Sequence, residues 1–343
     1  MRDLSADREG YRLSIANRLF GQAGYPFKQP FLDTTGRDYG APLEPVDYKS
    51  DHEAARLRIN EWVEDQTNDK IRELLPKGSI NEQARLVLTN AIYFDGSWKY
   101  KFDEKSTRQE SFHSGGGESQ VSMMRQQQRF QYAELPGFQM LEMPYAGDDL
   151  SLVALLPTER DGLAAVEAAL TPEVWNDGVA ALRDAQVNVT FPKFKFDSSF
   201  KLAEQLKAMG MTDAFDVDLA DLTGIASPPD ETLSIDKVLH KAFIDVNEVG
   251  TEAAAATAVI IIGTTSAIMP LPPKEFRADH PFLFALRDRH SGSLLFLGRV
   301  TDPGALAAAA AASTPEPGNL TFILVGVIGL VIPCRRRRKP LAA

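Results

Sequence analysis

The chain has 343 residues, of which 44% are hydrophobic and 24% charged, and its formal net charge is −10. This composition is typical of a folded protein with one large or two medium domains, and it excludes a wholly disordered or collagen-like chain. The acidic balance argues against nucleic acid as a partner. A single cysteine excludes an internal disulfide framework, and the five scattered histidines lack metal-ligand spacing, so we expect neither a metal nor another cofactor.

Hydrophobic periodicity predicts the elements of the first half of the chain. Residues 1–10 are polar and charged and lack the basic and apolar regions of a secretory signal. Residues 51–73 repeat apolar side chains at helical spacing, which predicts a helix. Residues 85–94 and 150–156 are apolar runs, the first of them rich in β-branched and aromatic side chains, and both predict strands.

The second half continues with strand patterns and one short helix. Strands and helices do not alternate strictly, so the predicted fold class is α+β. Near the C-terminus, two strands are expected to form a hairpin through the turn sequence 289–292. The expected elements are strands at 187–194, 233–247, 281–288 and 293–300 and a helix at 202–209.

Residues 248–266 combine properties that no ordinary loop needs. With a period of two, one face of this segment carries only small or β-branched, uncharged side chains. Such a segment can enter a sheet as an extra strand, yet it has no side chain large enough to anchor a core beforehand. The Gly-, Thr-, Ser- and Pro-rich stretch that follows, up to Pro273, is typical of an exposed loop. We therefore predict a mobile loop that can become a strand. The residues of that face are Thr251, Ala253, Ala255, Thr257, Val259 and Ile261.

From about residue 11 to residue 303, the chain resembles the serpins, a family of protease inhibitors. The resemblance implies a large central, mostly antiparallel sheet, further sheets, surrounding helices and an exposed reactive-centre loop. The hinge motif GTEAAAAT (250–257) is highly specific for this family. The other matching segments are ANRLFG (16–21), INEWVEDQTNDKI (59–71), LTNAIYFDGSWKYKF (88–102), FPKF (191–194), LHKAFIDVNEVGTEAAAAT (239–257), FRADHPFLFALRD (276–288) and LFLGRVTDP (295–303).

Residue by residue, the resemblance assigns roles to a few side chains. It implies that Glu248 and Lys193 form the family's ion pair where the loop enters the sheet, and that Trp98 packs there. It implies that Asn90 and His240 belong to the region over which the sheet strands part, although buried Asn and His side chains are also common as satisfied core residues. The proximal hinge would comprise Glu248, Gly250, Thr251, Glu252, Ala253, Ala254, Ala255, Ala256 and Thr257.

The resemblance also implies a mechanism in which the chain is not an enzyme. A target serine or cysteine protease attacks the loop and forms an acyl-enzyme, and the cut loop then inserts into the central sheet. The protease is distorted before it can hydrolyse the acyl bond. The catalytic base and oxyanion hole belong to the protease, so this chain contributes no catalytic residue.

The cleaved bond is expected between Thr264 and Thr265 when residues are counted from the hinge. Counting back from the segment at Phe276 moves the bond several residues later, so the window is 262–269. This window contains no Arg, Lys or acidic residue. Trypsin-like and caspase-like targets are therefore disfavoured, and an elastase-, subtilisin- or chymotrypsin-like protease is the expected partner.

The two ends of the chain depart from the family pattern. Serpins carry several helices and a strand before the segment that resembles ANRLFG, whereas only 15 residues precede it here. We expect that this sequence is truncated and lacks the N-terminal helices; the alternative is a protein that is truly shortened. The expected organisation is a serpin domain at 1–303, an Ala- and Pro-rich linker at 304–318 and a tail at 319–343.

The tail resembles the bacterial PEP-CTERM sorting signal, which a membrane exosortase processes. An apolar run at 320–332 would rise about 20 Å as a helix, short of a bilayer core of about 30 Å. A sorting signal implies delivery to the cell envelope or exterior and removal of the tail, whereas the competing interpretation is a retained membrane anchor. The residues that carry the resemblance are Pro315, Glu316, Pro317, Arg335, Arg336, Arg337 and Arg338.

Three functions remain in competition. The first is a monomeric suicide inhibitor of serine proteases, the second a non-inhibitory serpin-like binding or structural protein, and the third an inactive fragment. The hinge favours the first, because non-inhibitory relatives tend to carry bulky, charged or proline residues there. The glycines at 115–117 lack the strand-to-helix setting of a phosphate loop, and the aspartates at 216–221 lack the glycine and glutamate of a calcium loop.

Overall fold

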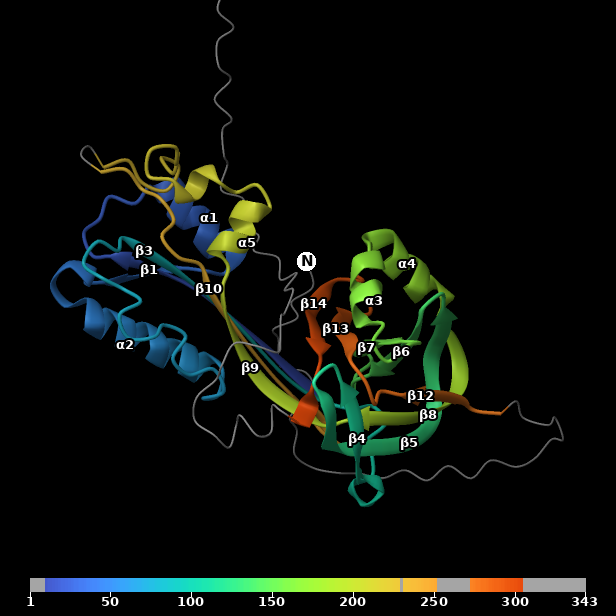
Figure 1. Ribbon diagram of the computed structural model, residues 1–343. Helices are drawn as coiled ribbons and strands as arrows, with labels where there is room; N and C mark the ends of the chain where they lie inside the picture. Colours follow the sequence, from blue (N-terminus) through green and yellow to red (C-terminus); the bar gives the residue numbers. More distant parts are fainter. Residues whose placement is uncertain (1–9, 229–230, 252–271, 305–343) are drawn as a thin grey trace, which may run out of the picture. The chain divides into compact units, whose positions relative to one another are not determined.

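The computed structural model describes residues 10–228, 231–251 and 272–304 (Figure 1). Its described residues form two sheets with helices, which confirms the α+β class. One sheet has six strands in the order β2-β1-β3-β11-β10-β9. The other has eight strands in the order β12-β8-β5-β6-β7-β13-β14, with β4 paired to β5.

The six-stranded sheet contains both parallel and antiparallel pairs. β1 and β2 run parallel, with Leu19 opposite Leu43. β3 and β10 run parallel where Ala91 faces Lys241, and β11 is antiparallel to both β3 and β10. The strands of this sheet are β1 (Tyr11–Gln22), β2 (Leu43–Val46), β3 (Leu86–Ser97), β9 (Phe194–Lys201), β10 (Leu239–Val246) and β11 (Gly250–Thr251).

The eight-stranded sheet is built around the long strand β5, which pairs antiparallel with β4, β6 and β8. β7 is buried along its whole length, which agrees with its mainly apolar sequence, and its one polar residue, Ser151, donates a hydrogen bond to the Glu142 carboxylate (2.7 Å). The strands are β4 (Arg108–Ser114), β5 (Gly117–Leu135), β6 (Phe138–Pro144), β7 (Leu150–Pro157), β8 (Arg183–Pro192), β12 (Lys274–Arg277), β13 (Phe282–Asp288) and β14 (Leu294–Val300).

The helices include the predicted ones, but the long helix differs at both ends. It begins at Tyr48, after the Asp47 side chain accepts a hydrogen bond from the Ser50 amide, and ends at Gln66 rather than residue 73. The prediction fails there because the chain then turns through left-handed residues such as Asn68 (φ 50°). The helices are α1 (Gln29–Tyr39), α2 (Tyr48–Gln66), α3 (Leu163–Ala169), α4 (Pro172–Ala181), α5 (Ala203–Ala208) and the 3₁₀ turns η1 (Glu104–Ser106) and η2 (Asp213–Phe215).

Two predicted strands have different bounds in the structure. The run at 187–194 covers the end of β8 and the first residue of β9, with Lys193 between the two strands. The run at 233–247 is a strand only from Leu239, because the Ile235 amide donates to the Ala214 carbonyl (2.8 Å) instead of to a neighbouring strand. The predicted strands at 85–94 and 150–156, the short helix and the C-terminal hairpin are confirmed.

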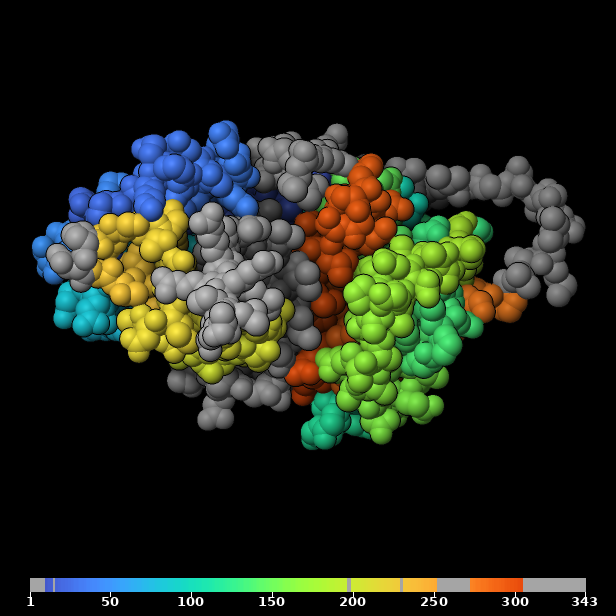
Figure 2. Space-filling view, turned by 90° about the horizontal axis from the view of Figure 1, so that it is seen from above, coloured from blue at the N-terminus to red at the C-terminus, as the bar shows by residue number. Residues whose placement is uncertain are grey.

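The described residues belong to two compact units, each with its own core. Of the described residues, one unit draws on 10–13, 94–196, 244–251 and 272–304, and here α3 and α4 pack on β6, β7 and β13. Figure 2 shows these helices beside the orange β13 and β14. The other unit draws on 14–93, 197–228 and 231–243, and here α2 buries Ile59 and Val63 against β1 and β3. Among the helices that the structure describes, none is both long and apolar enough to cross a membrane.

Candidate functional site

The predicted hinge begins with a tight reversal between β10 and β11. β10 ends at Val246, which faces Thr251 across the reversal. The Asn247 amide donates to the Gly250 carbonyl (2.8 Å), and the Asn247 side chain accepts hydrogen bonds from the Val249 amide (3.0 Å) and the Gly250 amide (3.3 Å). These bonds return the chain into the sheet beside the strand from which it came.

Glycine is required at position 250 by the close approach of β3. Gly250 pairs with Ser97 and Thr251 with Gly96. A Cβ atom on Gly250 would lie 1.9 Å from the Gly96 carbonyl oxygen, so no side chain fits there. The hinge glycine therefore permits β11 to lie between β3 and β10.

The structure joins Glu248 to Lys193, the pair named from the sequence. The Glu248 side chain is 7% exposed, and its Oε2 lies 2.8 Å from the Lys193 ammonium. Its Oε1 accepts a hydrogen bond from the Thr107 hydroxyl (2.8 Å). Burial alone would raise the pKa of Glu248, but the bonds from Lys193 and Thr107 outweigh burial and hold this pKa below its ordinary value. The buried carboxylate is therefore ionised at neutral pH.

Trp98 lies beside this pair and holds the backbone of the hinge. Its indole Nε1 donates to the Asn247 carbonyl (2.9 Å), and its amide donates to the Val249 carbonyl (2.8 Å). The Phe102 amide donates to the Glu248 carbonyl (2.9 Å). The three successive backbone carbonyls of residues 247–249 thus accept hydrogen bonds from Trp98 and Phe102, which fixes the chain where the predicted hinge begins.

Tyr145 and Thr107 are residues of this site that sequence reasoning missed. The Tyr145 ring stacks on Trp98, with ring centres 4.5 Å apart, and its hydroxyl lies 2.7 Å from the Thr251 hydroxyl. Burial raises the pKa of Tyr145, so the phenol stays protonated. Neither residue belongs to a motif or lies within a strand, because Thr107 directly follows η1 and Tyr145 directly follows β6, so no local pattern in the sequence pointed to them.

Asn90 and His240 lie together in the other unit. The Asn90 side chain donates to the Asn17 side chain (2.7 Å), and the Asn90 backbone bonds to His240. His240 is 3% exposed, its ring lies over Phe200, and its Nε2 has no hydrogen-bond partner in the described part of the chain. Burial lowers the pKa of His240 to about 4, so its imidazole is neutral at pH 7.

The remaining predicted site residues lie outside the described residues. These are the hinge residues after Thr251, the predicted scissile bond and the residues of the tail. They comprise Glu252, Ala253, Ala254, Ala255, Ala256, Thr257, Thr264, Thr265, Pro315, Glu316, Pro317, Arg335, Arg336, Arg337 and Arg338.

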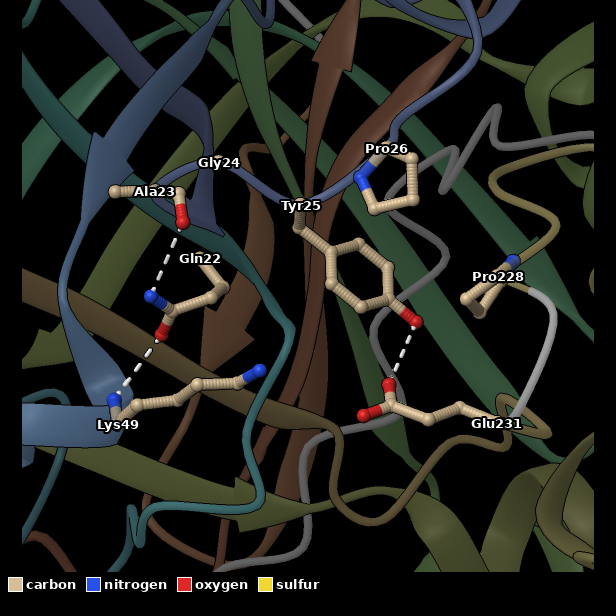
Figure 3. Close-up of a pocket in the computed structure, with 8 residues that line it drawn as sticks. All are labelled: Gln22, Ala23, Gly24, Tyr25, Pro26, Lys49, Pro228 and Glu231. Carbon is tan, nitrogen blue, oxygen red and sulfur yellow. Dashed lines mark hydrogen bonds between the residues drawn. The ribbon is translucent and has the colours of Figure 1, made fainter.

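A hollow of about 250 Å³ near the start of α2 is the other candidate site (Figure 3). Several of its polar groups already take part in hydrogen bonds. The Tyr25 hydroxyl donates to the Glu231 carboxylate (3.0 Å). The two oxygens of this carboxylate also accept hydrogen bonds from the Arg85 guanidinium. Burial and the neighbouring Glu231 raise the pKa of Tyr25 to about 12. Tyr25 and Glu231 are therefore already engaged, and the described residues hold no metal-binding cluster.

The described part of the predicted hinge is a two-residue strand between β3 and β10, which is the arrangement expected where a serpin reactive-centre loop begins. Comparison with known proteins gives the same answer, because residues 1–303 match the family model "Serpin (serine protease inhibitor)". The chain belongs to the serpin family. This is a family of protease inhibitors rather than enzymes.

Individual relatives agree with this assignment. The chain is 42% identical to serpin B4 of Homo sapiens over 306 residues, covering 88% of this chain and 77% of the relative. It is 42% identical to the leukocyte elastase inhibitor of Homo sapiens over 310 residues, covering 88% and 80%. The solved structure of tengpin, a thermophilic serpin in its native state, matches with a TM-score of 0.77 and 30% identity, covering 87% and 76%.

Proposed function

We propose that this serpin inhibits serine endopeptidases as a suicide substrate. The protease cleaves the reactive-centre loop, and the acylated loop inserts into the six-stranded sheet before the acyl bond is hydrolysed. The observation that carries this proposal is β11, a two-residue strand held between β3 and β10 at the start of the loop. Strand addition at this position only has to continue in the direction that β11 has begun.

The pairing of β3 indicates what insertion must displace. β3 pairs with β11 at Gly96 and Ser97, but with β10 directly at Ala91–Tyr93. A longer β11 would have to replace these direct pairings. The sequence after Thr251 is suited to this, because its side chains are small or β-branched where they would face the sheet interior.

The target class follows from the loop sequence and from the relatives. The window 262–269 contains no basic or acidic residue, which favours elastase-, subtilisin- or chymotrypsin-like proteases. One relative at 42% identity is named for inhibition of leukocyte elastase, which supports the first of these. We propose that residues 1–303 form the inhibitory domain, that the linker 304–318 joins it to the tail, and that the tail at 319–343 acts as a sorting signal for an exosortase-type enzyme at the cell envelope.

The test is a gel assay for an SDS-stable complex between the purified chain and a protease of each class. Mass spectrometry of the released C-terminal peptide locates the cleaved bond, which we expect within 262–269. A covalent complex supports the proposal, whereas cleavage in this window without a complex identifies a non-inhibitory substrate. No cleavage by any of the three classes contradicts the proposed target class.

A matched pair of hinge variants tests insertion itself. Ala255→Pro removes a backbone donor from the strand that would form, and we expect cleavage without a complex. Ala255→Ser keeps the side chain small and should still trap the protease. Equal trapping by both variants would contradict insertion as the source of inhibition.

A further inference from the structure

Tyr145, the residue directly after β6, packs between two aromatic rings. Its ring stacks on Trp98 at an interplanar angle of 14° and meets the Phe94 ring edge-on, with ring centres 4.8 Å apart. Its amide donates to the Leu150 carbonyl (2.9 Å), and no part of the residue is exposed. Contacts on both sides therefore fix the place of its hydroxyl.

The hydroxyl of Tyr145 contacts the side chain of Thr251, the second residue of β11. Thr251 is fully buried, and the two oxygens are 2.7 Å apart. If Thr251 left the sheet, both hydroxyls would lose this bond, and the Tyr145 hydroxyl would remain in a buried site. Breaking such a bond without replacement disfavours the open state about tenfold.

We propose that the Tyr145 hydroxyl is a latch that keeps Thr251 in the sheet before the loop is cleaved. Tyr145 is a positioning residue, because it holds Thr251 in place and does not itself contact the protease. This inference rests on the proposed function and names a residue that controls it. Insertion then starts from a strand that is already two residues long, and such preorganisation lowers the cost of the later steps.

The latch matters because trapping competes with hydrolysis of the acyl-enzyme. A loop whose first residues already pair with β3 and β10 needs only to extend this ladder. A loop whose hinge has left the sheet must first re-enter between two strands. Loss of the latch is therefore expected to divert cleaved molecules toward release, so more inhibitor is consumed for each protease trapped.

The first experiment measures the latch without any protease. Amide hydrogen exchange of residues 247–251 is followed by mass spectrometry in the full chain and in Tyr145→Phe, Thr251→Val and the double variant. Each single variant should exchange about tenfold faster in this segment, and the double variant no faster than either, because both lose the same bond. Thr251→Ser keeps the hydroxyl, so residues 247–251 should exchange as slowly in this variant as in the unaltered chain.

A matched control separates the latch from general loss of stability. Tyr132→Phe also removes one phenol hydroxyl from the same unit, where it donates to Glu134 (3.0 Å), and it should leave exchange at 247–251 unchanged. Additive effects of Tyr145→Phe and Thr251→Val would overturn the proposal. Equal acceleration in β13 would overturn it as well, since that would indicate loosening of the whole unit.

The second experiment measures the number of inhibitor molecules consumed per trapped protease. Tyr145→Phe should raise this number about twofold or more, whereas Tyr132→Phe should not. If the unaltered chain traps the protease and Tyr145→Phe consumes the same number of inhibitor molecules per trapped protease, the proposed effect of the latch on inhibition is wrong. If the unaltered chain traps no protease, the proposed function fails, and the exchange data alone decide whether the latch exists.

Discussion

The ion pair of Lys193 with Glu248 allows a quantitative prediction. Lys193→Met would keep the aliphatic stem and remove the charge, leaving the buried carboxylate with its hydrogen bond from Thr107 but without a cationic partner. A hydrogen bond to a charged group contributes about 1.5–3 kcal/mol. The Lys193 side chain is 41% exposed, so solvent screening reduces this value, and we expect a loss of about 1–2 kcal/mol at pH 7.

The pH dependence of this loss identifies its origin. The folded-state pKa of Glu248 lies below its ordinary value of 4.5, so the pair stabilises the folded state above that pH. The contribution disappears as the pH falls through the folded-state pKa, because protonation removes the charge that Lys193 stabilises. The difference between the unaltered chain and Lys193→Met should therefore be full at pH 7 and shrink in acid.

Urea unfolding at several pH values measures this difference, with Lys195→Met as the matched control. Lys195 lies two residues away and pairs with Asp245 at 3.0 Å, but its side chain is 57% exposed, so its loss should cost less than about 1 kcal/mol. The reasoning is refuted if the two variants are equally stable at pH 7, or if the cost of Lys193→Met does not depend on pH.

Two further variants test the sheet on which the loop depends. His240 is neutral and buried with a pKa of about 4, below its ordinary 6.5, so the unfolded chain binds more protons between these values and stability should fall by about 3 kcal/mol as the pH drops from 6.5 to 4. His240→Phe should lose this part of the pH dependence, measured by urea unfolding. Gly250→Ala places a Cβ against the Gly96 carbonyl and should expel β11, which faster amide exchange at 247–251 and loss of the protease complex would report. Gly115→Ala lies in an open turn and should change neither, while unaltered exchange in Gly250→Ala would contradict the register of β11.

Local patterns predicted the elements whose apolar runs are bounded by turn residues. β7 and the β13–β14 hairpin lie where their sequences indicated, because mainly apolar runs and a Gly-containing turn leave few alternatives. Where prediction failed, a local signal was overridden. The helical pattern at 51–73 continues past the end of α2 because Ile71 remains fully buried, although the chain around it is no longer helical. Burial alone therefore maintains the apolar spacing beyond the helix.

The amino-acid sequence by itself determined the family and the character of the hinge. The small residues of the hinge, including Gly250, can be read directly from the sequence. Only the tertiary structure decided which side chains hold the hinge. Tyr145 and Thr251 are 106 residues apart, and Thr107 and Glu248 are 141 apart. Such pairs form no sequence motif, because their distances depend on how whole strands pack, and each contact follows from the fold rather than from its own neighbours in the chain.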